Sequence, residues 1–141
     1  MKTRHTALIA LAIIAAAVAV QAQTFYPKLK NFSAADKDRM DKVFAGCLSS
    51  ENNGIVQDAL AIVSMMKLDT PEDDYPRIKD ELDDLAVSSE TPAIRYNAYL
   101  AGAVFANPSF FQQETKRLYD NPDAFFRALA ERLTKSFLTS L

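Results

Sequence analysis

Histidine is almost absent from this chain of 141 residues, in which His5 is the only one. If the first 22 residues are removed, as the pattern below predicts, none is left. The side chain that most often transfers protons near neutral pH is then missing, which excludes histidine-based catalytic triads and histidine metal sites. We therefore expect neither a metal nor another cofactor.

Cysteine is equally scarce, since Cys47 is the only one in the chain. A single cysteine forms no disulfide within the molecule, so stability has to come from the hydrophobic core. Cys47 lies in the apolar stretch 43–48, a setting that predicts a buried and unreactive thiol.

Glycine is also rare, with 3 residues, whereas hydrophobic residues make up 49% and charged residues 24% of the chain. This composition is typical of a domain that folds around a core, and it differs from that of disordered or low-complexity segments. At about 100 to 200 residues per domain, the length leaves room for one domain.

The first 22 residues have the pattern of an export signal. A short basic stretch ending at His5 precedes an uncharged apolar run over residues 7–20, which is shorter than the roughly 20 residues that span a bilayer. Val20 and Ala22 suit the positions three and one before a cleavage site, so we expect cleavage after Ala22. An uncleaved anchor is the alternative.

Three segments follow from this pattern. They are a cleavable signal peptide over 1–22, an extension over 23–33, and a single α-helical domain over 34–141. The processed protein is expected in the periplasm or outside the cell, without a stable membrane anchor.

Charge is balanced slightly toward the acidic side. Removal of residues 1–22 leaves 14 basic and 18 acidic residues, which argues against nucleic-acid binding. Residues 69–90 hold nine acids and two bases. This segment is either a surface that attracts basic partners or divalent cations, or a face kept soluble by repulsion.

Six helices are predicted from recurrent start signals. A capping residue followed by proline marks a helix start, because the cap accepts from an orphan N–H and proline fits the first turn. Such pairs occur at Thr70-Pro71, Thr91-Pro92, Asn107-Pro108 and Asn121-Pro122, and weaker signals occur at Ser33 with Asp36 and at Asn53-Gly54. The expected helices are 34–48, 54–68, 71–87, 92–106, 108–119 and 122–138, with no strand, which gives an all-α fold.

The hydrophobic pattern assigns positions to these helices. Residues 71–87 and 122–138 each carry one apolar stripe and belong at the surface or an edge. Residues 54–68 and 92–106 are apolar nearly all round and should lie in the centre.

An internal similarity links the two central helices. Residues 54–59 align with residues 93–98 at a spacing of 39 residues, and Ala59 and Ala98 fall on matching positions. A helical repeat of about 40 residues resembles the HEAT and armadillo families, which implies antiparallel helix pairs stacked as a short solenoid. Residues 107–121 depart from a regular repeat, and an irregular helical bundle is the alternative.

The resemblance implies that the central helices present residues to a partner. The candidates are Gln57, Asp58, Arg95, Tyr96 and Tyr99. Half-buried tyrosines that serve packing are the competing interpretation. Two adjacent aromatic residues, Phe110 and Phe111, form a second candidate surface.

Catalytic motifs are weak by comparison. Ser64 and Lys67 match the Ser-x-x-Lys pattern of acyl enzymes, but the partner motifs of those enzymes are absent. We therefore expect a non-enzymatic protein that binds a protein or peptide partner in the cell envelope. The alternatives are a subunit that oligomerises through Phe110, Phe111 and the last helix, and a pocket protein or enzyme that uses carboxylate, lysine and tyrosine groups.

Overall fold

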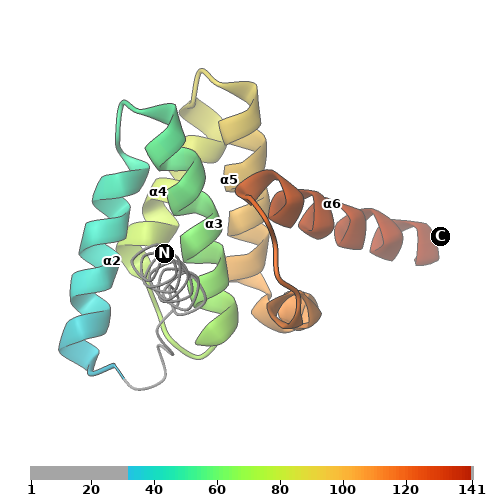
Figure 1. Ribbon diagram of the computed structural model, residues 1–141, viewed down its shortest axis with the longest axis horizontal. Coiled ribbons are helices and arrows are strands. Elements are labelled where there is room, and N and C mark those ends of the chain that lie inside the picture. Colours follow the sequence, from blue (N-terminus) through green and yellow to red (C-terminus); the bar gives the residue numbers. More distant parts are fainter. Residues whose placement is uncertain (1–31, 141) are drawn as a thin grey trace, which may run out of the picture.

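The computed structural model describes residues 32–140 (Figure 1). This part of the chain contains five α-helices, one 3-10 helix and no strand, which confirms the predicted all-α fold. The helices are α2 (Ala34–Leu48), α3 (Asn53–Asp69), α4 (Pro76–Ser88), α5 (Pro92–Ala106), η2 (Pro108–Lys116) and α6 (Pro122–Thr139). The predicted export signal and most of the extension lie outside the described residues.

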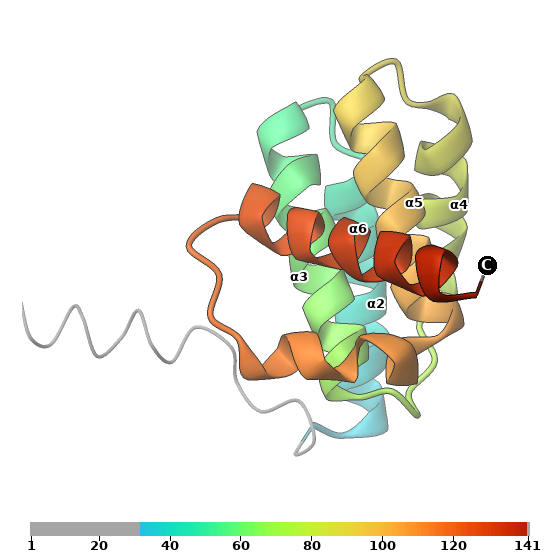
Figure 2. The same cartoon turned by 90° about the vertical axis from the view of Figure 1, so that its right-hand side faces the viewer.

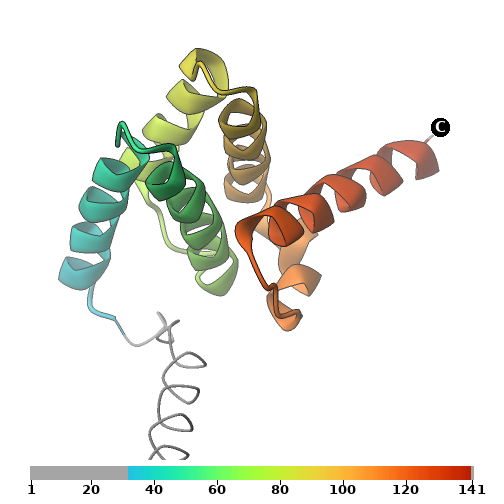
Figure 3. The same ribbon diagram turned by 45° about the horizontal axis from the view of Figure 1, so that its top comes forward.

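The first four helices form two antiparallel pairs, α2 with α3 and α4 with α5. The pairs stack so that α2 contacts α4 and α3 contacts α5, which gives two layers of helices (Figure 3). Both η2 and α6 cross the layer formed by α3 and α5 (Figure 2). The end of α6 extends away from the helix pairs.

The two helices predicted to be central supply most of the core. In α3, eight residues from Val56 to Leu68 are buried, and α5 buries six from Ile94 to Val104. The predicted surface helix α4 buries only Ile78 and Leu82. The pattern of apolar residues thus identified the layer on which the fold is built.

Most of the predicted helix starts are confirmed. Ser33 accepts a hydrogen bond from the backbone N–H of Asp36 at 3.2 Å, and the Asp36 carboxylate accepts from the Ser33 N–H. The side chains of Asn107 and Asn121 cap η2 and α6 in the same way. The helix α3 begins one residue earlier than predicted, because Asn52 is its cap.

The prediction of a helix start at Thr70-Pro71 is wrong. Thr70 ends α3 instead, since its hydroxyl donates to the Met66 carbonyl at 3.0 Å and bonds the Tyr75 hydroxyl at 2.8 Å. The chain then runs through a connection, and α4 begins at Pro76. The acidic residues 72–74 therefore lie in this connection and not in a first helical turn.

The segment predicted as a helix over 108–119 also differs. It is a 3-10 helix that ends at Lys116. The backbone is extended at Arg117, which turns the chain into the segment that leads to α6. This segment forms one wall of the site described next.

Candidate functional site

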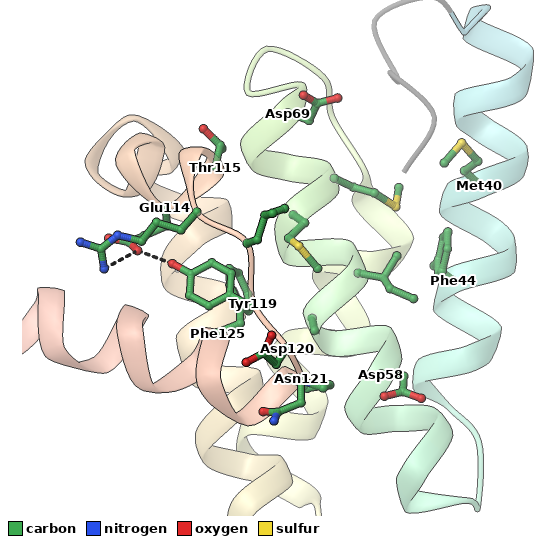
Figure 4. A pocket seen from close by; sticks show the side chains of 17 residues that line it. Met40, Phe44, Asp58, Asp69, Glu114, Thr115, Tyr119, Asp120, Asn121 and Phe125 are labelled. Atoms are coloured by element: carbon green, nitrogen blue, oxygen red, sulfur yellow. Dashed lines mark hydrogen bonds and ion pairs between the residues drawn. The ribbon is translucent and has the colours of Figure 1, made fainter. Parts of the chain in front are cut away.

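A groove of about 710 Å³ lies between α2, α3 and the segment 117–121, which connects η2 to α6 (Figure 4). Met40 and Phe44 of α2 form one wall, and Ile62 and Met65 of α3 form the floor. These side chains are apolar and only partly buried. The groove therefore presents apolar surface to solvent in the part of the chain that the structure describes.

The opposite wall is held by a buried carboxylate. Glu114 is 5% exposed, accepts a hydrogen bond from the Tyr119 hydroxyl, and lies 3.7 Å from the guanidinium groups of both Arg117 and Arg132. Burial and the Glu114 carboxylate raise the pKa of Tyr119 to about 12. Tyr119 is therefore a neutral hydrogen-bond donor at physiological pH, and its ring packs against Phe125. This network fixes the position of the segment beside the groove.

Carboxylates mark both ends of the groove. Figure 4 shows Asp69 at one end and Asp58 with Asp120 at the other. None of these three carboxylates makes an ion pair or a hydrogen bond with another residue of the described range 32–140. The groove thus combines an apolar floor with negative charge at its ends.

The internal similarity explains why α3 has this open face. Helices α3 and α5 begin 39 residues apart, at Asn53 and Pro92. The stripe of α5 that packs toward α3 consists of three buried residues, the first of which donates to Gln57 of α3 at 3.0 Å: Asn97, Ala101 and Val104. Their counterparts 39 residues earlier are Asp58, Ile62 and Met65, which line the groove. The groove is therefore the place that a preceding helix would occupy in a longer stack.

The structure distributes the predicted central-helix residues over different places. Asp58 lines the groove, whereas Gln57 is engaged by Asn97 between α3 and α5. Arg95 donates to the Ser89 carbonyl. Tyr96 and Tyr99 are 54% and 56% exposed on the outer face of α5. Of these residues, only Asp58 belongs to the groove.

The two adjacent phenylalanines lie elsewhere. Phe111 is buried in the core, and Phe110 is half-buried beneath the guanidinium group of Arg132, 5.1 Å from the ring centroid. At the end of the last helix, Phe137 and Leu138 are exposed. Sequence reasoning placed Ile62 and Met66 in a helix apolar all round, but it did not identify Met40, Met65 or Tyr119 as parts of a groove.

The Ser-x-x-Lys motif is not arranged for acyl transfer. Ser64 is buried and donates to the Leu60 carbonyl at 2.7 Å. The Lys67 ammonium donates to the carbonyls of Pro71 and Asp73, at 3.0 and 2.6 Å, so it holds the connection before α4. Both groups therefore serve the local fold.

Three further observations concern other predicted features. Cys47 is half-buried. Within residues 32–140, no group of three or more side chains is arranged to hold a metal ion, and no helix there is long and apolar enough to cross a bilayer. In the acidic segment, Asp73 pairs with Lys37 and Asp83 pairs with Lys79.

Comparison with known proteins finds no matching family model, no matching curated protein and no matching solved structure. The function is therefore argued from the geometry of the groove.

Proposed function

We propose that this chain is an exported, non-enzymatic helical-repeat protein of the HEAT and armadillo type. In this proposal it acts in the periplasm or outside the cell and binds a segment of a partner protein in the groove. The observation that carries the proposal is the equivalence of two faces: α3 turns toward the groove the residues that correspond to those by which α5 packs on α3. An apolar segment, bound as a helix, is the occupant that such a face suits.

The chemistry of the groove favours a particular kind of segment. Met40, Met65 and Met66 have flexible, polarisable side chains that adapt to different apolar partners. The carboxylates at the two ends favour positive charge in the partner. The expected ligand is therefore a short apolar segment flanked by lysine or arginine residues.

Peptide binding tests this proposal directly. The probes are two fluorescein-labelled helical peptides that share an apolar core, one flanked by lysines and the other by glutamates. Fluorescence anisotropy should show that the lysine peptide binds at least about tenfold more tightly, and that salt reduces the difference.

Two variants locate the binding site. Ile62→Glu introduces a charge on the floor of the groove and should raise the Kd of the lysine peptide by at least about tenfold. Val87→Glu is the matched control, because Val87 is 83% exposed on α4, outside the groove. Equal binding of both peptides, or equal affinity of both variants, would contradict the proposal.

A further inference from the structure

We propose that residues 23–31 of the same chain occupy the groove in the free protein, so that a partner binds by displacing them. This inference rests on the groove as the binding site proposed above and adds how access to it is regulated. It is argued from where the segment joins the described structure, from its length and from its charge.

The segment joins the fold at the correct end of the groove. The described chain begins at Phe32, which is half-buried against the core, and α2 starts two residues later at Ala34. Because α2 and α3 are antiparallel, the start of α2 lies beside the end of α3, where Asp69 marks one end of the groove (Figures 1 and 4). A chain that leaves Phe32 therefore meets the groove at this end.

The segment is also long enough. The groove follows α3 from Asp69 to Asp58, a distance of about 16 Å at about 1.5 Å per residue. Nine residues in an extended conformation reach about 30 Å at about 3.3 Å per residue. Pro27 disfavours a helix at the residue before it, which suits an extended occupant.

Charge and hydrophobicity are complementary. The segment 23–31 has three apolar side chains, Phe25, Tyr26 and Leu29, two bases, Lys28 and Lys30, and no acid. The groove offers an apolar floor and carboxylates that have no described partner. Because the segment is covalently attached, its effective concentration is of the order of millimolar, which compensates for weak individual contacts.

Disulfide trapping in the full processed chain tests the proposal. Cys47→Ser removes the native thiol, after which Tyr26→Cys and Ile62→Cys place one thiol in the segment and one in the groove. The matched control combines Tyr26→Cys with Lys42→Cys. Lys42 is exposed on α2, two residues after Met40 and thus about 200° round the helix from it. Under mild oxidation, the groove pair should form an intramolecular disulfide at least about tenfold faster than the control pair.

The other outcomes of trapping overturn the proposal. Equal rates in the two pairs, or no disulfide in a folded groove variant, would show that the segment does not prefer the groove. A disulfide between two chains would assign the groove to a second copy.

A second variant makes the test independent of the introduced thiols. Phe25→Ser with Leu29→Ser, in the chain that retains Cys47, should lower the Kd of the lysine peptide by about tenfold, because the competing segment is weakened. An unchanged Kd would contradict displacement. If the groove disulfide forms but no peptide binds, the proposed function fails and the intramolecular contact stands; peptide binding without the disulfide gives the reverse.

Discussion

Asp41 shows how a single charged residue joins the two helix pairs. It is 2% exposed, and its carboxylate accepts from the backbone N–H groups of Arg77 and Ile78 at 3.2 and 2.9 Å. The residue before α4, Tyr75, makes no side-chain cap of its own. A carboxylate on α2 therefore caps α4 from a distance of 36 residues along the chain, where the helix dipole favours negative charge.

Replacement of this cap should be costly. Asp41→Ala leaves two backbone donors without a partner and removes one acceptor for Arg77, so we expect a loss of about 2 to 3 kcal/mol in the free energy of unfolding by urea. Asp38→Ala is the control, because Asp38 also pairs with Arg77 but is exposed. That change should cost less than about 1 kcal/mol. Similar losses in both variants would show that the cap contributes little.

Tyr119 should be recognisable by its titration. The pKa is raised from 10.0 to about 12 in the folded protein, by burial and by Glu114. The protonated hydroxyl therefore stabilises the fold fully below pH 10, and this contribution is lost as the pH rises toward 12. The tyrosinate absorbance of the native protein minus that of Tyr119→Phe should have its midpoint near pH 12. A midpoint near pH 10 in the folded state would contradict the network.

At the level of helices, the close approach of neighbours depends on small residues. Ala59 of α3 and Ala98 of α5 are 2% and 0% exposed and hold matching positions of the repeat. Both had been identified from the sequence spacing alone. Their burial agrees with the expectation that an alanine at this position lets a neighbouring helix come close.

Larger side chains at these positions should not fit. We expect Ala59→Leu and Ala98→Leu each to lower the free energy of unfolding by about 1 to 3 kcal/mol through overpacking. Ala106→Leu, at the exposed end of α5, should change it by less than about 0.5 kcal/mol. Thermal unfolding measures all three, and unchanged stability of the two buried variants would remove the support for a repeat contact.

The helix boundaries show what the sequence could predict. Local capping chemistry gave the correct starts at Ser33, Asn107 and Asn121, because the cap and its acceptor lie within three residues. It failed at Thr70-Pro71, where the same residue types close α3. The deciding contacts there involve Tyr75 and the distant Asp41, and no local pattern reports them.

In the molecule as a whole, the core could be predicted and the groove could not. The apolar periodicity of α3 and α5 identified the central layer correctly. The same periodicity treats Ile62 and Met65 as core residues, because a pattern does not show that one neighbouring helix is missing. The wall around Tyr119 comes from a 3-10 helix and a connecting segment, neither of which has a periodic pattern.

The repeat also has two different ends. Val56 and Leu60 of α3 are buried, whereas their counterparts on α5, Arg95 and Tyr99, are polar or exposed. The stack therefore has a direction, with an apolar end at α3 and a polar end at α5. A segment that adds at α3 finds no equivalent apolar face at α5 on which a further unit could add. Assembly through the groove would consequently stop at one bound segment per chain, and it would not propagate into a fibre.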